Sequence, residues 1–290
     1  MSVTTASNQA VIQTAVQKSL ELPLTEASQF LSSGVRIIDS AAPVSFPTLT
    51  DDTDDPSYVA ETGQIPETDL TIGGIPCMPS TMQGLKQIVR VSNLDLRASS
   101  LDLSSLIQSR LVEGVSRKLD TAFFSAGGDG TTTIKGIFNR SLPSFDVAGA
   151  LTFDKLLQAK ATITKKYVQQ SSLRLFLHPD DVAKLEQAKD NDGKYLWESD
   201  ITAAGVQTFR GIPVITTDRL PNTTGQTPTG RGLLADMSGC VVVRDLTGQV
   251  LVLKELYQAT DETGLKVSAR MDYAILNPDK FLVLSGISRS

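Results

Sequence analysis

The clearest pattern of apolar and polar positions lies between residues 99 and 128. Ser99 and Ser100 are good helix N-caps, and Asp102 lies where the positive end of a helix dipole favours a carboxylate. Apolar residues then recur at helical spacing, at Leu103, Leu106, Ile107, Leu111, Val115, Leu119, Ala122 and Phe123. Gly127 and Gly128 end the run. The pattern predicts a helix of about 25 residues, roughly 38 Å long, which is long enough to serve as a structural spine.

After residue 150 the pattern changes from one long period to short alternating elements. The expected elements are a helix at 152–168, a strand at 173–177, a helix from Pro179 through Ala188, a strand at 211–217, a loop at 221–232, a hairpin of 240–246 with 250–256, and closing strands in the last 25 residues. Residues 1–22 are polar with scattered apolar positions, which predicts an extended arm or a short helix.

The stretch between these regions has an unusual composition. Six of the 13 prolines lie between Pro43 and Pro79, and no lysine or arginine occurs from Ile37 through Leu85. The same stretch holds seven acidic residues after position 50: Asp51, Asp52, Asp54, Asp55, Glu61, Glu67 and Asp69. Proline excludes a long helix here, so residues 55–92 are interpreted as a long hairpin-like extension. A lone two-stranded ribbon is marginal in water, so we expect the extension to rest on another subunit.

Composition and charge exclude several classes of function. The net charge of -5 argues against a dedicated nucleic-acid binder, which needs a basic face. No apolar run reaches the length of a membrane-spanning helix, and the first 20 residues do not form a secretory signal. The two cysteines, Cys77 and Cys240, are far apart and indicate neither a disulfide framework nor a zinc site.

Motifs that carry chemistry are weak throughout the chain. The glycines of 127–136 follow a helix instead of preceding one, which is the wrong order for a phosphate-binding loop. His178 is the only histidine and has no GxSxG nucleophile motif to accompany it, and Cys77 has no positioned base in view. The sequence therefore predicts no catalytic residue, no cofactor and no enzyme activity.

The segment DNDGKYLW (190–197) begins like a calcium loop but fails the test of spacing. Counted from Asp190, Lys194 occupies the fifth ligand position, and the glycine falls at position 4 instead of 6. A turn after the helix at 179–189 explains Asp192 and Gly193 better, with Tyr195, Leu196 and Trp197 as apolar anchors. We therefore predict no metal site.

The order of several weak motifs is specific when they are taken together. These motifs are YVAETGQIPETDLT (58–71), LKQIVRVSNLDLRASSLDL (85–103), LDTAFFSAGGDGTTTIKGIFN (119–139), the helix led by HPDD followed by KDNDGKYLW, FRGIPVITTDRLP (209–221) and VSARMDYAILNPDKFLVL (267–284). In this order they resemble the major capsid proteins of tailed bacteriophages with the Hong Kong 97-type fold. The resemblance spans about 55–285.

The resemblance implies an α+β fold with an N-terminal arm, an extended E-loop hairpin, a P-domain with a long spine helix and closing sheet, and an A-domain. The implied boundaries are 1–45 for the arm, 46–92 for the E-loop and its flanking strands, 93–145 for the P-domain spine, 146–245 for the A-domain, and 246–290 for the closing P-domain strands. Only about 40 residues precede the E-loop, so we expect no fused scaffolding domain.

The resemblance also assigns expected roles to residues. The E-loop of this family lies over a neighbouring subunit, which implies contacts there by Tyr58, Glu61, Gln64, Ile65, Glu67 and Asp69. Some relatives join an E-loop lysine to an asparagine, but no lysine occurs from Ala41 to Leu85, so we expect no such cross-link. The turn of Asp192, Gly193, Tyr195 and Trp197 would define the fold of the A-domain. The acidic E-loop predicts a basic patch on the neighbour, for which Arg117, Lys118, Lys165 and Lys166 are candidates.

The implied function is a major capsid protein of the virion. It would assemble in the host bacterial cytoplasm as hexamers and pentamers into an icosahedral shell around double-stranded DNA. Its partners would be copies of itself, a separate scaffolding protein, a portal and a decoration protein, with no membrane and no sequence-specific DNA binding. Two alternatives stay open: an encapsulin-like nanocompartment shell on the same fold, and a small hydrolase that uses His178 or Cys77.

Overall fold

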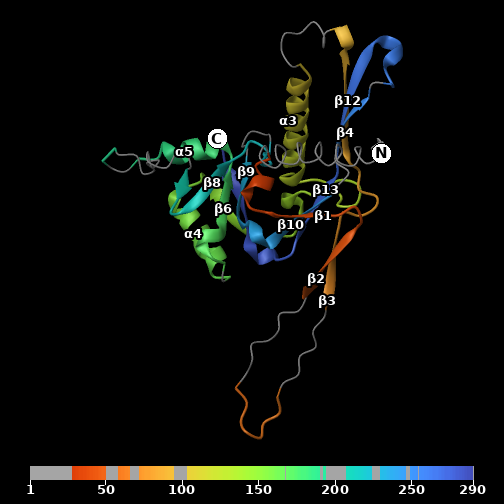
Figure 1. The fold of residues 1–290 in the computed structure, drawn as a ribbon. Coiled ribbons are helices and arrows are strands. Elements are labelled where there is room, and N and C mark those ends of the chain that lie inside the picture. The colour runs from red at the N-terminus through yellow and green to blue at the C-terminus, as the bar shows by residue number, and fades with distance from the viewer. Residues whose placement is uncertain are drawn as a thin grey trace, which may run out of the picture.

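The structure is a computed structural model with a central body and two projections in opposite directions (Figure 1). It describes residues 28–49, 58–65, 72–94, 103–166, 168–189, 192–193, 207–223, 229–245, 249–253 and 255–289. A two-stranded ribbon projects from one end of the body. The helix at 103–123 and the paired strands at 85–92 and 262–269 project from the other end (Figure 1). Within these ranges, no helix has the length and apolar character needed to cross a membrane.

The long helix predicted from the apolar spacing is present as α3 (Leu103–Phe123), with 21 residues. The predicted caps at Ser99 and Ser100 lie outside the described residues. The helix at 152–168 is confirmed as α4 (Phe153–Thr164), where the Thr152 side chain accepts a hydrogen bond from the backbone N–H of Lys155. The third helix, α5 (Pro179–Glu186), begins at the predicted proline and follows the predicted strand β6 (Leu173–Leu177) without a long loop.

Four sheets organise the described strands. The largest has the order β5 (Ser144–Gly149), β14 (Phe281–Ser288), β9 (Thr229–Asp236), β6, β8 (Ile212–Thr216) and β7 (Thr208–Phe209). The second has the order β1 (Arg36–Asp39), β10 (Cys240–Arg244) and β13 (Met271–Ile275). The third has the order β11 (Gln249–Leu253), β12 (Glu262–Ala269) and β4 (Leu85–Ser92). The fourth pairs β2 (Val44–Leu49) with β3 (Ile72–Cys77).

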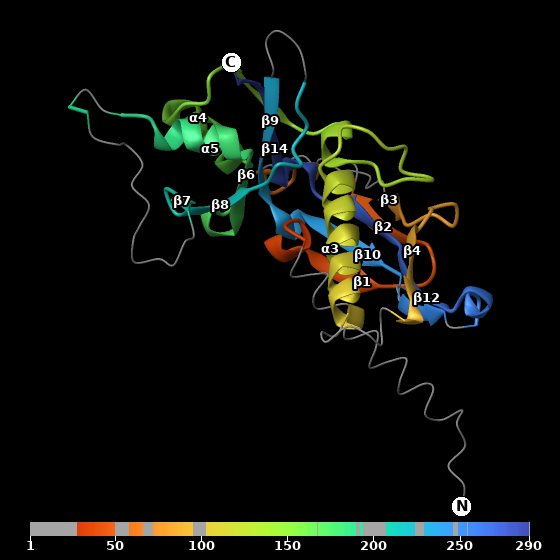
Figure 2. The ribbon, with the colours of Figure 1, turned by 90° about the horizontal axis from the view of Figure 1, so that it is seen from above.

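The six-stranded sheet separates two hydrophobic cores. Side chains alternate along its strands, so that Leu233 of β9 joins the same cluster as Leu119 and Phe123 of α3, whereas Leu234 joins the cluster that contains Leu156 of α4. Figure 2 shows β9 and β14 between α3 on one side and α4 with α5 on the other. The helices therefore cover opposite faces of one sheet.

Two predicted hairpins are wrong in their strand partners. Residues 55–92 were expected to form one extension, but β2 pairs with β3, and β4 pairs along its whole length with β12 instead. The segments 240–246 and 250–256 do not pair with each other, because β10 lies between β1 and β13 while β11 pairs with β12. The predicted loop at 221–232 is also too long, since β9 already begins at Thr229.

Candidate assembly surface

The β2–β3 ribbon is an arm that leaves the body. The described segment 58–65 lies farther out than the ribbon, away from the body (Figure 1). Tyr58 is 109% exposed and Ile65 is 74% exposed, and Glu61 and Gln64 are exposed beside them. Large apolar side chains exposed on a projecting segment are typical of an interaction surface, so the outer segment has the character of a contact site for another molecule. Glu67 and Asp69, predicted to belong to the same contact, lie outside the described residues.

The arm is long compared with the body. About 16 residues separate Val44 at the root from the segment around Glu61, and an extended chain of that length spans at most about 50 Å. A compact chain of this size has a radius of gyration of about 19 Å. A fully extended arm of this chain length would exceed that radius, and the segment 58–65 lies far from the body (Figure 1).

The root of the arm is fixed by a small apolar cluster and one buried carboxylate. Cys77 and Met78 are buried against Val243 and Ala274. The backbone N–H of Met78, which has a left-handed φ of 54°, donates to Asp272 Oδ2 at 2.8 Å. Burial raises the pKa of Asp272, although the hydrogen bond from Met78 opposes this effect. Asp272 therefore holds the chain in a strained conformation at the point where the arm meets the body.

A second set of contacts holds the loop that follows β3. The Arg270 Nη2 atom donates to the carbonyl oxygen of Pro79 at 2.7 Å. The Thr81 hydroxyl donates to the Thr131 carbonyl at 2.8 Å, and the Gln83 N–H donates to the Thr132 carbonyl at 2.9 Å. The loop after β3 is therefore held by hydrogen bonds to the glycine-rich segment at 127–136.

The glycine-rich segment owes its shape to Asp129. This carboxylate accepts hydrogen bonds from the backbone N–H groups of Thr131, Thr132 and Thr133 at 3.1, 3.0 and 2.8 Å. Their hydroxyls also donate to it, and these donors hold the pKa of Asp129 well below its usual range. Gly128 has a φ of +91°, a conformation that suits glycine. The segment is therefore a turn held by its own hydrogen bonds, and its Thr131 and Thr132 carbonyls support the loop at the arm root.

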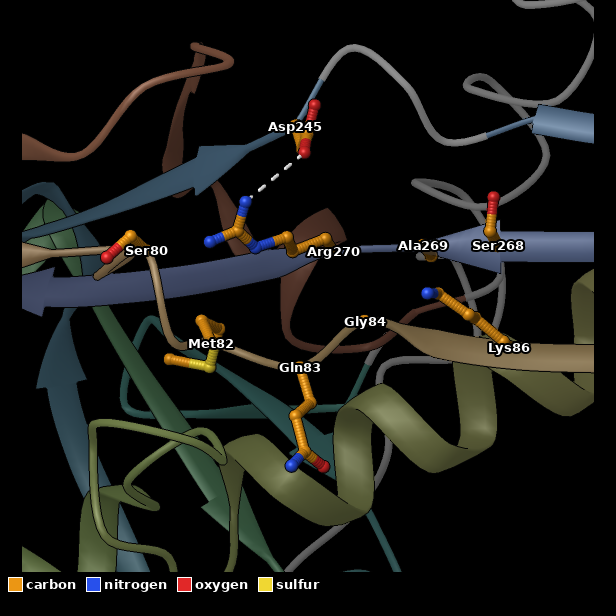
Figure 3. Close-up of a pocket in the computed structure, with 9 residues that line it drawn as sticks. All are labelled: Ser80, Met82, Gln83, Gly84, Lys86, Asp245, Ser268, Ala269 and Arg270. Carbon is orange, nitrogen blue, oxygen red and sulfur yellow. Dashed lines mark ion pairs between the residues drawn. The ribbon is translucent and has the colours of Figure 1, made fainter.

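A pocket of about 510 Å³ opens where the arm root meets the β4–β12 sheet (Figure 3). It is lined by Ser80, Met82, Gln83, Gly84, Lys86, Asp245, Ser268, Ala269 and Arg270. The Arg270 Nη1 atom lies 3.6 Å from Asp245 Oδ2, which is an ion pair but too long for a hydrogen bond. The Arg270 Nε atom is buried without a hydrogen-bond partner. The pocket therefore contains two cations, Lys86 and Arg270, against one carboxylate.

The first described residues form another junction, which sequence reasoning missed. Asp120 on the buried face of α3 accepts a hydrogen bond from the Ser28 hydroxyl at 2.5 Å and from the backbone N–H groups of Gln29 and Phe30 at 3.0 and 3.3 Å. The Phe30 ring stacks on Phe123 at 4.5 Å between centroids. Burial raises the pKa of Asp120. The only sequence signal was an aspartate on the otherwise apolar face of a helix.

The four residues predicted as a basic patch do not form one patch within a subunit. Arg117 and Lys118 are exposed on α3, whereas Lys165 and Lys166 follow directly after α4. The six-stranded sheet lies between these two helices (Figure 2). Arg117 also has a carboxylate 4.0 Å away on its own helix, and Lys166 forms an ion pair with Asp279.

The predicted A-domain turn is only partly described. Asp192 and Gly193 lie in a turn, and Gly193 has a φ of +78°, which suits glycine. Tyr195 and Trp197 lie outside the described residues.

His178 and Cys77, the two residues considered for a hydrolase, have surroundings that suit a structural role. His178 is the N-cap of α5, and its Nδ1 atom accepts a hydrogen bond from the Asp180 N–H at 3.2 Å. Burial raises the pKa of the Cys77 thiol to about 12, which disfavours the thiolate that a nucleophile requires. In the described part of the chain, no three His, Cys, Asp or Glu residues form a group suited to a metal ion.

Comparisons with known proteins agree with this architecture. The family model described as the phage capsid family matches residues 9–286. The capsid of a native GTA particle has a TM-score of 0.70 at 19% identity, over 90% of each chain. A chain of Mycobacterium phage Adephagia has a TM-score of 0.68 at 12% identity, over 90% of this chain and 89% of that one.

An encapsulin has the same fold. The SrpI encapsulin of Synechococcus elongatus has a TM-score of 0.62 at 15% identity, over 89% of this chain and 87% of the other. Comparison with curated protein sequences finds no match. The structural likenesses establish a shared fold, and the family match covers most of the chain.

Proposed function

Because the chain belongs to the phage capsid family, a family of shell-forming structural proteins, we propose that it forms hexamers and pentamers that close an icosahedral shell around double-stranded DNA. The observation that carries this proposal is the arm, which extends the exposed side chains of Tyr58, Glu61 and Ile65 beyond the body. Many modest contacts between identical copies suit a shell, since misplaced copies can leave while the completed assembly persists.

The arm supplies the contact between subunits in this proposal. Tyr58, Glu61, Gln64 and Ile65 lie against a neighbouring copy, as do Glu67 and Asp69 of the same segment. The N-terminal arm adds further contacts, starting from its junction with α3 at Asp120 and Phe30. The segments 93–145 and 246–290 serve as the P-domain and 146–245 as the A-domain, with the turn at Asp192 and Gly193 inside the latter.

The shell is held together without covalent bonds between subunits. An E-loop lysine is needed for the lysine–asparagine cross-link, and residues 41–85 contain none. The assembled protein is therefore expected to migrate as a single-chain band after boiling in denaturant. A ladder of covalent oligomers on the same gel would contradict this part of the proposal.

Other parts of the assembly follow from the capsid role. A scaffolding protein, a portal and a decoration protein are the expected partners, and assembly takes place in the cytoplasm of a bacterial host. DNA is enclosed without sequence-specific binding, which is consistent with the net charge of -5. The role is structural, and no catalytic residue, cofactor or metal is assigned.

Electron microscopy of the purified protein, combined with light scattering, tests the proposal. Uniform icosahedral particles, or free hexamers and pentamers, would support it. A chain that stays monomeric even with its own scaffolding protein present would contradict it. Screening for hydrolase activity, with His178→Ala as the control variant, would then be the next experiment.

The encapsulin-like shell is the second candidate, because an encapsulin shares the fold over most of both chains. The contents of native particles distinguish the two functions. Packaged double-stranded DNA supports the phage capsid, and an enclosed enzyme with no genome supports the nanocompartment.

A further inference from the structure

The pocket at the arm root has the composition of a site for an anionic group. Lys86 and Arg270 give two formal positive charges against the single negative charge of Asp245, and Ser80, Gln83 and Ser268 add neutral hydrogen-bonding groups. Lys86 is exposed and forms no ion pair with another described residue. The Arg270 side chain is 23% exposed, so an incoming group can reach its charge from the pocket. A carboxylate is a suitable ligand for this combination of groups.

The arm segment has an excess of negative charge in its sequence. Seven acidic residues and no basic ones lie between positions 50 and 70, and the one acidic residue of the described segment 58–65, Glu61, is exposed. The ribbon directs this segment away from the body (Figure 1). Glu61 is thus presented away from the body, and every copy of the chain has both the acidic segment and the pocket.

We propose that the pocket formed by Lys86, Arg270 and the loop after β3 receives a carboxylate from the acidic arm segment 51–69 of a second copy. The proposal rests on the proposed shell function and names the partner surface for the arm. It replaces the predicted basic patch, since Arg117 and Lys118 lie on the other side of the six-stranded sheet from Lys165 and Lys166.

The site would connect neighbouring arms to one another. Arg270 also donates to the Pro79 carbonyl at 2.7 Å, and Pro79 lies in the chain that leads from the arm to β4. A carboxylate bound at Arg270 therefore contacts the residue that holds the root of the recipient's own arm. Occupation of the pocket stabilises the root, so each docked arm favours one position of the next.

A zero-length carbodiimide cross-link tests the proposal on the unmodified chain. The reagent joins a carboxylate to a lysine amine in direct contact, with loss of water, and peptide mass spectrometry identifies the pair. Particles are assembled from an equal mixture of ¹⁵N-labelled and unlabelled chains, so that mixed-isotope pairs identify links between copies. The expected product joins Lys86 to an acidic residue of 51–69 in mixed-isotope pairs.

The other lysines in the same particles act as internal competitors. Links from the arm only to Lys118, Lys165 or Lys166 would overturn the proposal, as would particles with no arm link at all. Light scattering on the same sample reports assembly independently. A chain that never assembles would count against the shell function itself, and this outcome is distinct from assembled particles that lack the Lys86 link.

A pair of substitutions separates charge from chemistry at the pocket. Lys86→Arg keeps the charge and removes the reactive amine, so the link should vanish while assembly is unchanged. Lys86→Glu should weaken each contact about two- to fivefold, the range for an exposed ion pair, and the loss should shrink as salt rises. Lys118→Glu is the matched control. Lys86→Glu could instead lower only the DNA content of the particles, with assembly and the cross-links between other residues unchanged. In that case the pocket binds nucleic acid, and the proposal fails.

Discussion

Removal of the Asp272 carboxylate should loosen the arm without unfolding the body. Asp272 is 4% exposed and accepts the Met78 N–H at 2.8 Å, so Asp272→Ala leaves a buried donor without a partner. Loss of a hydrogen bond to a charged acceptor costs about 1.5–3 kcal/mol. Met78 also has a φ of 54°, a conformation that costs a non-glycine residue about 1–2 kcal/mol and that the bond to Asp272 helps to maintain. Both effects favour opening of the root.

The magnitude translates directly into a rate of hydrogen exchange. A loss of about 1.5–3 kcal/mol in opening free energy corresponds to roughly ten- to a hundredfold faster exchange at the Met78 amide. Amides of α4 and β6, which lie outside the small cluster at the arm root, should keep their protection from exchange. Asp272→Asn retains an oxygen acceptor and should produce a much smaller effect, and the exposed Asp279→Ala serves as a surface control. Unchanged exchange at Met78 in Asp272→Ala would refute the role assigned to this carboxylate.

The dependence on pH gives an independent check of the same residue. Burial raises the pKa of Asp272 above the ordinary value of 3.8, so the folded state binds the proton more tightly than the unfolded state. The free energy of unfolding should therefore fall as pH rises from about 4 through the raised pKa, and this contribution should be constant at higher pH. Asp272→Asn should remove this decline. Chemical denaturation at several pH values measures the free energy of unfolding of both proteins. If this free energy changes with pH in parallel in the wild type and in Asp272→Asn, the contribution assigned to Asp272 is contradicted.

Three further outcomes are expected. Asp120→Ala should speed hydrogen exchange of the Phe30 amide and lower the free energy of unfolding by about 2–4 kcal/mol, because three donors lose their acceptor. An unchanged exchange rate would argue against this junction. His178→Ala should lower the free energy of unfolding by about 0.5–2 kcal/mol through the lost N-cap and leave particle yield unchanged, as measured by denaturation and light scattering. Cys77 and Cys240 should resist thiol reagents at pH 8 until the protein unfolds, since burial raises both pKa values; rapid labelling of the folded protein would show that they are accessible.

Elements with a strong local signal were predictable from the sequence. The spine helix follows from apolar residues at helical spacing, and α5 follows from a proline and two aspartates at its start. The strand at 173–177 is confirmed with the predicted bounds. In each case the deciding interactions lie within one turn or one strand, so neighbouring residues contain enough information.

Strand partners and the polar contacts at the arm root could not be predicted in the same way. β10 and β11 are adjacent in sequence and both apolar, which suggested a hairpin, yet β10 is buried between β1 and β13 and pairs with neither β11 nor β12. Asp272 and Met78 are 194 positions apart, and Arg270 and Pro79 are 191 apart. Periodicity reports which face of an element is buried and contains no information about a partner so distant in the chain.

The body and the arm are stabilised by different kinds of interaction, and this difference has a consequence for assembly. The body has two apolar cores on opposite faces of one sheet, and apolar burial opposes any large change in the packing of its helices. The arm root has a small cluster and a few directional hydrogen bonds, at Met78, Pro79, Thr81 and Gln83. In the proposed shell of hexamers and pentamers, one chain would occupy positions with unequal neighbours. Exchange of a few hydrogen bonds costs far less than repacking a core, so copies in different positions should differ in the angle of the arm at its root and share the same body.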